Sequence, residues 1–332
     1  MFSQDIGIDL GTANVLIYIK GQGIVLNEPS VVAIDSYTKK ALAVGTEARN
    51  MLGRTPGKVT AIRPMKDGVI ADFDITEVML DHFINKAGCK GILGKPRILI
   101  CCPSDITQVE KNAIKEAAER TGAKKVFIEE EPKVAAVGAG LDISAPCGNM
   151  IIDIGGGTTD IAILSLGGIV TSSSIKVAGN TFDTDIMKYI KNKYKLLIGD
   201  MTAENIKLNI GNVFHESKKN IEKMNVRGRD LVSGLPHTIT ITSEEVEEAL
   251  KESTMIIVHT AKNVLEQTPP ELSADIVDRG ITLTGGGSLI KGLDKLLESE
   301  LKVPVTLAEN PLACVALGTG IMLENIHLID NV

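Results

Sequence analysis

The feature that most constrains the fold is a pattern that occurs twice, about half a chain apart. Residues 5–14 and 149–160 each contain an apolar strand, an aspartate near its end, a glycine-rich turn with threonine, and the start of a second strand. Such self-similarity indicates an internal duplication. We therefore expect two similar lobes that face each other, with the boundary near residues 144–148.

Strand and helix patterns alternate along the whole chain, which predicts the α/β fold class. Residues 97–102 form a short, continuously apolar run, as expected for a strand of a buried sheet. A second strand is expected at 126–128. The spacing of apolar residues and the local start signals predict helices over 75–86, 107–120 and 132–140.

Composition limits the classes of function. The 332 residues suffice for about two domains, and 35 basic against 42 acidic residues give a net charge of −7, so a nucleic-acid partner is not expected. Five cysteines without a C-x-x-C pair are typical of reduced core thiols in a cytosolic protein. No run approaches the ~20 apolar residues of a membrane span, so any membrane contact is expected to be peripheral.

Three glycine-rich turns are the candidate ligand-binding elements: residues 9–14, 153–160 and 283–288. Glycines let backbone N–H groups approach a phosphate together, and threonine hydroxyls add donors. The third turn is expected to lead into a helix over 289–297, whose N-terminus would favour an anion. One such turn alone is more often a tight hairpin, but three in one chain favour nucleotide binding. Asp9 and Asp153 suit a hydrated Mg²⁺ between the first two turns.

These turns resemble the phosphate and adenosine motifs of the superfamily of actin, sugar-kinase and 70-kDa heat-shock ATPases. Further segments, including several outside the three turns, are similar to the MreB family of bacterial actins, which organises cell shape. The similar segments are 23–30, 50–56, 61–73, 268–272 and 279–287.

The resemblance implies an actin-like (ribonuclease H-like) duplicated fold, with two lobes of two subdomains around a nucleotide cleft. Lobe I would comprise residues 1–145 and about 315–332, with a small subdomain over about 32–66. Lobe II would comprise residues 146–314, with a small subdomain over about 182–243. ATP and Mg²⁺ would bind between the lobes.

The resemblance also assigns roles in hydrolysis. Glu131, the last residue of a triple-glutamate segment, stands where the family carries its water-positioning glutamate, and Thr158 is the second catalytic candidate. Asp9 and Asp153 would hold Mg²⁺ through water. Without the resemblance, three consecutive glutamates are more typical of a solvated turn.

Glu204 and Lys207 share one helical face, where the family contacts ribose and adenine. Taken alone, this spacing is typical of an exposed ion pair. The nucleotide-binding residues implied by the resemblance are Gly11, Thr12, Ala13, Asn14, Gly155, Gly156, Gly157, Thr158, Gly179, Asn180, Glu204, Lys207, Gly285, Gly286, Gly287 and Ser288.

Some positions differ from the usual family pattern. They are Val15, Lys133, Asp160, the segment 178–180 and Leu317. Lys133 adds a charge close to Glu131, and Asp160 shortens a carboxylate by one methylene. None of these removes the core of the site, but together they leave the rate of hydrolysis and its coupling to assembly open.

The resemblance implies a homopolymer of paired head-to-tail protofilaments, with the helix region 105–125 as the lateral contact. The chain would lie in the cytoplasm, peripherally on the inner face of the cell membrane. Ile92 and Leu93, between two glycines, are the candidate membrane loop, although a buried loop tip explains them equally well. Other MreB paralogues and membrane-anchored morphogenesis proteins are possible partners.

Four other functions are alternatives to this interpretation. A heat-shock type chaperone is not expected, because the sequence shows no separate peptide-binding domain. A sugar or acetate kinase is not expected, because the sequence shows no signature of a pocket for a second substrate. A plasmid-segregating actin would need a DNA–adaptor partner and would not bind lipid. A polymerising MreB paralogue with little hydrolysis stays open because of the differences above.

Overall fold

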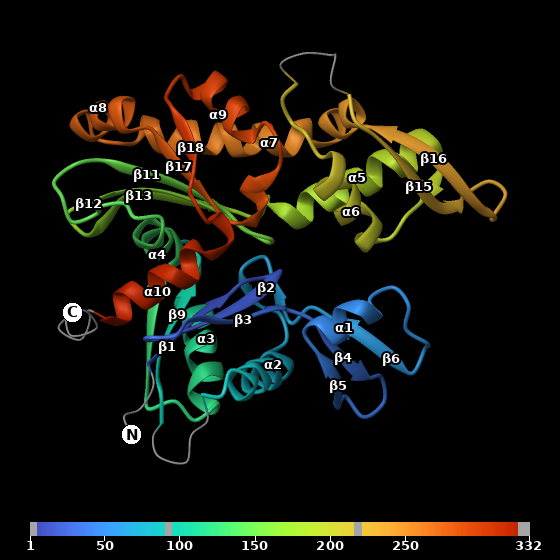
Figure 1. Ribbon diagram of the computed structural model, residues 1–332, viewed down its shortest axis with the longest axis horizontal. Helices are drawn as coiled ribbons and strands as arrows, with labels where there is room; N and C mark the ends of the chain where they lie inside the picture. Colours follow the sequence, from blue (N-terminus) through green and yellow to red (C-terminus); the bar gives the residue numbers. More distant parts are fainter. Residues whose placement is uncertain (1–4, 90–94, 216–220, 325–332) are drawn as a thin grey trace.

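The computed structural model describes residues 5–89, 95–215 and 221–324. Two five-stranded sheets with the same topology form the centres of the two lobes (Figure 1). In each, three antiparallel strands are followed by two strands that run parallel to the first. The equal strand order confirms the predicted duplication and the α/β class of the fold.

The sheet of lobe I has the order β10-β9-β1-β2-β3. Its strands are β1 (Asp5–Leu10), β2 (Asn14–Ile19), β3 (Gly23–Pro29), β9 (Arg97–Cys102) and β10 (Lys125–Glu130). The sheet of lobe II has the order β13-β12-β11-β17-β18. Its strands are β11 (Asn149–Ile154), β12 (Thr159–Ser165), β13 (Gly168–Ile175), β17 (Ile281–Thr284) and β18 (Val305–Leu307).

Alternating side chains of β9 divide the core of lobe I between two faces of its sheet. Ile98 and Ile100 pack with α2 (Phe73–Lys86) and α3 (Gln108–Arg120), whereas Leu99 and Cys101 face the other lobe. Both helices begin at side-chain caps: Asp72 accepts from the Ile75 N–H, and Thr107 forms a reciprocal capping box with Glu110. The predicted helices 75–86 and 107–120 are therefore confirmed within two residues.

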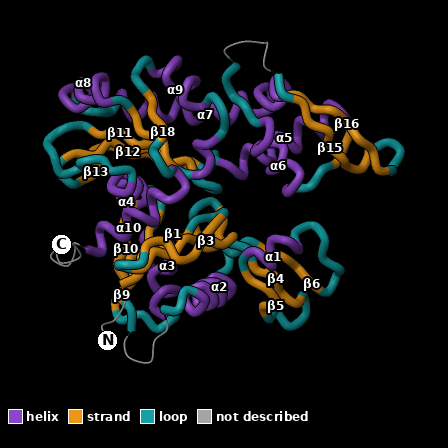
Figure 2. Tube along the Cα trace, in the orientation of Figure 1, coloured by secondary structure: helices purple, strands orange, loops and turns teal. Residues whose placement is uncertain are grey.

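Two helices lie between the sheets and join the lobes (Figure 2): α4 (Glu131–Gly138) and α10 (Cys314–Glu324). Their backbones are in contact, because a Cβ on Gly318 would lie 2.0 Å from the Val134 carbonyl oxygen. Lobe II is covered by α7 (Ser243–Glu266), α8 (Pro270–Arg279) and α9 (Leu293–Leu301). The two lobes are thus connected through closely packed helices rather than through an open linker.

Each lobe carries a smaller sheet at the same end of the molecule (Figure 1). In lobe I it is formed by β4 (Val32–Asp35), β5 (Ala41–Val44) and β6 (Val59–Ile62), with α1 (Thr46–Met51). In lobe II it is formed by β14 (Leu196–Leu197), β15 (Lys223–Asp230) and β16 (Pro236–Thr242), beside α5 (Gly179–Tyr194) and α6 (Asp200–Ile210). The residue bounds given above for lobes and subdomains stay a prediction.

Four short elements complete the described chain: β7 (Met65–Lys66), β8 (Val69–Ile70) and the 3-10 turns η1 (Gly286–Leu289) and η2 (Pro311–Ala313). The helix expected at 289–297 was placed wrongly. After β17 the chain forms the 3-10 turn η1 (Gly286–Leu289), and α9 starts only after Gly292, whose φ of 80° sets a sharp change of direction.

Candidate functional site

A cavity of about 270 Å³ lies between the two lobes and brings together nearly all the predicted site residues. Of the predicted nucleotide, metal and catalytic positions, every one except Ser288 lines it. Additional lining residues include Arg49, Arg63, Gly68, Asp183, Leu289 and Leu312.

The two phosphate turns meet at backbone distance across the lobes. A Cβ on Gly156 would lie 2.6 Å from the Ala13 Cβ, and one on Gly157 would lie 2.5 Å from the Thr12 hydroxyl oxygen. The same hydroxyl accepts a hydrogen bond of 3.0 Å from the N–H of Gly68. Only glycine allows this approach, so the repeated glycines of the sequence have a tertiary reason.

Asp9 and Asp153 are the last residues but one of the equivalent strands β1 and β11, and both line the cavity from opposite lobes. Burial raises the pKa of Asp9 to about 7, and burial with the neighbouring charges of Asp160 and Asp9 raises the pKa of Asp153 to about 8. No basic side chain among the described residues lowers either pKa. Two such carboxylates fit a hard divalent cation, which prefers oxygen ligands.

A direct metal cage is not formed within the described part of the chain, where no group of three or more His, Cys, Asp or Glu side chains is placed to hold an ion. The arrangement of Asp9 and Asp153 therefore suits a cation that keeps most of its water and phosphate ligands.

Of the three consecutive glutamates only Glu131 lines the cleft. It is the first residue of α4, and its pKa is raised well above the ordinary value, first by burial and then by the charges of Asp160, Asp9 and Asp153. A carboxyl group held close to three others accepts a proton more readily than one in water. Glu131 is thus suited to interact with a water molecule or a hydroxyl in the cavity.

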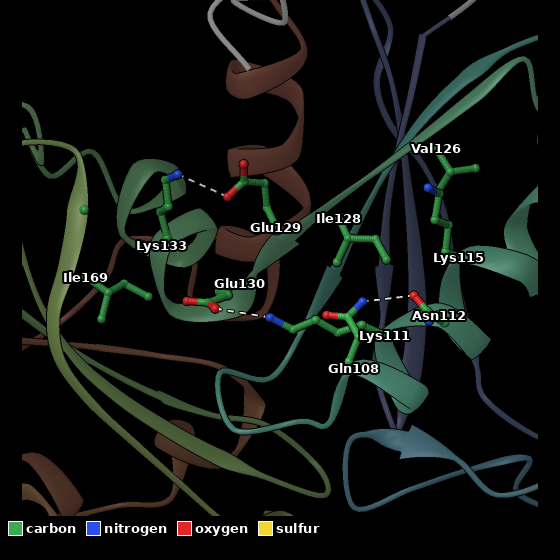
Figure 3. Close-up of a pocket in the computed structure, with 11 residues that line it drawn as sticks. Gln108, Lys111, Asn112, Lys115, Val126, Ile128, Glu129, Glu130, Lys133 and Ile169 are labelled. Atoms are coloured by element: carbon green, nitrogen blue, oxygen red, sulfur yellow. Dashed lines mark hydrogen bonds and ion pairs between the residues drawn. The ribbon is translucent and has the colours of Figure 1, made fainter. Parts of the chain in front are cut away.

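The other two glutamates face a second hollow of about 540 Å³, outside the nucleotide cleft, shown in Figure 3. Glu130 forms an ion pair with Lys111 of α3 at 3.3 Å, and Glu129 forms one with Lys133 of α4 at 3.1 Å. The expected added charge of Lys133 is therefore paired with Glu129. These two ion pairs hold the end of β10, directly before Glu131, against α3 and α4.

Asp160 joins the lobes beside the site. One carboxylate oxygen accepts a hydrogen bond of 3.0 Å from the Ser104 N–H of lobe I, and burial raises the pKa of the group. A second cross-lobe hydrogen bond of 2.8 Å runs from the Ser174 N–H to Asp105. Asp160 thus has a hydrogen-bond partner across the lobe boundary.

The third turn lies against the second. Gly285 has φ 81°, and a Cβ there would lie 2.4 Å from a carboxylate oxygen of Asp153. The Ser288 hydroxyl donates to the Gly285 carbonyl at 2.6 Å and is buried. Ser288 therefore stabilises the third turn through this hydrogen bond and does not line the cavity.

Glu204 and Lys207 on α6 do not pair with each other, contrary to the reading of their spacing as an exposed ion pair. Glu204 accepts from Arg49 of lobe I, with 2.7 Å between Nη2 and each carboxylate oxygen. Lys207 lies 2.9 Å from Asp183 and donates to the Gly179 carbonyl at 2.7 Å. Two basic residues of the cavity, Arg49 and Arg63, were not predicted from the sequence. No sequence motif links Arg49 with Glu204, because the two residues lie 155 positions apart.

The candidate membrane residues Ile92 and Leu93 lie outside the described residues. In the described part of the chain no helix is both long and apolar enough to cross a bilayer.

Sequence comparison finds close relatives. The family model of the MreB/Mbl protein matches residues 3–331. The chain is 68% identical to the cell shape-determining protein Mbl of Bacillus cereus, over 100% of this chain and 99% of that protein. It is 52% identical to the cell shape-determining protein MreB of Escherichia coli, over 99% of this chain and 95% of that protein.

Structural comparison agrees. MreB 5 of Spiroplasma citri bound to AMPPNP superposes with a TM-score of 0.94 at 44% identity, covering 100% of this chain and 99% of that one. The ADP-bound form of that protein gives a TM-score of 0.93 at 44% identity, covering 99% of each chain. The MamK double helical filament, at 22% identity, shares the fold with a TM-score of 0.83 and covers 97% of this chain and 98% of its own. With the duplicated sheets and the cleft between them, these matches show that the chain belongs to the MreB/Mbl family of actin-like cell-shape proteins.

Proposed function

We propose that this chain binds ATP in the cleft between its lobes, hydrolyses it slowly and couples its nucleotide state to filament assembly. The observation that carries this proposal is the convergence of three glycine-rich turns and Glu131 on one cavity. The Spiroplasma citri structures, which hold AMPPNP and ADP in the same fold, support nucleotide binding here.

In the proposed reaction the backbone N–H groups of the first two turns bind the phosphates, and Glu131 orients the attacking water with Thr158 beside it. We assign Mg²⁺ to the Asp9 and Asp153 carboxylates, through water; the ion would neutralise phosphate charge. The remaining phosphate contacts come from the N-terminal end of α5, at Gly179 and Asn180.

The adenosine end of the cleft is assigned to α6 and to the third turn. Glu204 and Lys207 would contact the ribose and the base, and Gly285, Gly286 and Gly287 would pack against the other side of the base. The half-buried position of both α6 side chains in the cavity wall supports this assignment.

We further propose that the filaments are paired protofilaments on the inner face of the cell membrane, with other MreB paralogues and membrane-anchored morphogenesis proteins as partners. The anchor would be Ile92 and Leu93. Insertion of two such side chains contributes roughly 3–6 kcal/mol per subunit, and a filament adds these terms multivalently.

Liposome co-sedimentation tests the anchor. Changing Ile92→Ser with Leu93→Ser should reduce binding to anionic vesicles, whereas Leu166→Ser, at an exposed residue on another loop, should not. Equal binding by the double variant and the native chain would show that the anchor lies elsewhere.

Phosphate release measured alongside pelleting, with ATP and with a non-hydrolysable analogue, tests the main proposal. Release that rises with protein concentration and assembly is expected. Assembly without release would identify the alternative, a polymerising paralogue that uses ATP as a structural ligand. Binding to a DNA–adaptor complex without lipid binding would instead indicate a plasmid-segregating filament.

A further inference from the structure

One ion pair crosses the cleft at the end that lies away from α4 and α10. Arg49 on α1 belongs to the small sheet region of lobe I, and Glu204 on α6 to that of lobe II; in Figure 1 these helices face each other across the lobes. Arg49 Nη2 lies 2.7 Å from both oxygens of Glu204. The neighbouring pairs Lys111–Glu130 and Lys207–Asp183 each lie within one lobe, whereas Arg49–Glu204 joins the two.

The position of the Arg49–Glu204 ion pair makes it sensitive to rotation of the lobes away from each other. Helix α4 packs against β11 and β12 of lobe II, and α10 packs against β1 and β2 of lobe I. The two helices meet at backbone contact at Gly138 and Gly318, so we take this crossing as the pivot. A contact at the opposite end of the cleft is separated most by a rotation about that pivot. Arg49 and Glu204 both line the cavity, so a bound ligand lies between the pivot and the pair.

The chemistry of the pair leaves room for a ligand. A carboxylate offers about four acceptor positions, and Arg49 approaches Glu204 with a single nitrogen. Glu204 therefore keeps acceptor capacity for a sugar hydroxyl while it binds Arg49. The side chains are 35% and 29% exposed, so the interaction is weak enough to break and re-form.

We propose that the Arg49–Glu204 ion pair is a latch that closes the cleft over bound nucleotide and limits the rate at which nucleotide dissociates. Arg49 is then a positioning residue: it acts through Glu204 and through lobe closure. This inference rests on the proposed binding of ATP in the cleft.

The test is stopped-flow dissociation of a fluorescent ATP analogue, chased with unlabelled ATP, at protein concentrations below assembly. Arg49→Met should release the analogue about three- to tenfold faster, the range expected for a partly exposed ion pair. Arg49→Lys, which keeps the charge, should fall between. Raising the salt concentration should speed release from the native chain towards the rate of Arg49→Met.

The matched control is Arg120→Met. It removes an arginine that pairs with Glu77 and Glu116 inside lobe I, so it loses the same kind of interaction without touching the cleft. Its dissociation rate should equal that of the native chain. Chemical unfolding of both variants separates lost stability from faster release, and an Arg49→Met variant that is less stable but releases nucleotide at the native rate overturns the latch.

A double-mutant cycle distinguishes a latch from a direct nucleotide contact by Arg49. Glu204→Gln combined with Arg49→Met should release nucleotide no faster than Glu204→Gln alone, because either change already breaks the latch. Additive effects would show that Arg49 acts independently and would overturn the proposal. A native chain that binds no nucleotide would overturn the proposed function itself, and the latch with it.

Discussion

The two ends of the nucleotide cleft are built in different ways. At the inner end the phosphate turns meet at backbone contact, with no space for a Cβ on Gly157. At the outer end the lobes are joined by Arg49 and Glu204, charged side chains that stay about one third exposed. Backbone packing fixes a geometry, whereas exposed ion pairs exchange readily. If the proposed function holds, hydrolysis would depend on the inner end and nucleotide exchange on the outer end.

The largest expected effect is at the inner end. Glu131→Gln removes the carboxylate proposed to orient the attacking water while it preserves the shape of the side chain, so phosphate release should fall about 10²- to 10⁴-fold. Binding of the fluorescent analogue should persist. The control is Glu130→Gln, one residue away and paired with Lys111 outside the cleft, which should change release little. An equal loss of phosphate release in both variants would show that Glu131 has no special role in hydrolysis.

The next effect tests the close approach of the turns. Gly157→Ala places a Cβ 2.5 Å from the Thr12 hydroxyl, so the lobes must separate there. Overpacking of this kind costs about 1–3 kcal/mol, and ATP affinity should fall by a comparable factor of roughly 5 to 100. Gly57→Ala adds a methyl group where no atom lies within 4 Å and should bind ATP normally. Titration of the fluorescent analogue measures both; native affinity in Gly157→Ala would mean that the turns are not rigid.

A smaller effect lies on α6. Lys207→Met leaves Asp183, only 13% exposed, without its cation. The free energy of unfolding should fall by about 1–3 kcal/mol, because a mostly buried carboxylate loses its partner. Urea unfolding of Lys207→Met and of Lys188→Met measures this; Lys188 is 67% exposed and pairs with Asp185, so its loss should matter little. Equal stability of the two variants would show that the Lys207–Asp183 ion pair contributes no more than an exposed ion pair.

The smallest effect concerns Lys133, two residues after Glu131. Lys133→Leu breaks its ion pair with Glu129, and this pair does not reach the cleft. We expect phosphate release to change less than about threefold, as for other surface ion pairs. The same release assay measures it, with Lys115→Leu, a lysine of the same hollow on α3, as control. A tenfold change in Lys133→Leu alone would show that the junction outside the cleft controls Glu131.

Much of the fold could be predicted because its signals are local. The run at 97–102 is β9 without a shift in bounds, and the capped helices α2 and α3 begin within two residues of their predicted starts. The start of α9 was predicted wrongly, because the 3-10 turn at Gly286–Leu289 is held by packing against Ile154 and by the backbone of Gly285, which hydrophobic spacing does not reveal.

Sequence patterns alone identified the glycines of the turns that meet across the cleft and an aspartate near the end of each equivalent strand. These signals are visible in short runs of the sequence, although the need for glycine at Gly156 and Gly157 comes from the contact with Ala13 and Thr12 of the other lobe. Only the tertiary structure decided that Glu131, and neither Glu129 nor Glu130, lines the cleft, and that Glu204 binds Arg49 rather than Lys207. Side-chain partners depend on which distant elements the fold brings together, and no spacing along the chain encodes a contact across 155 residues.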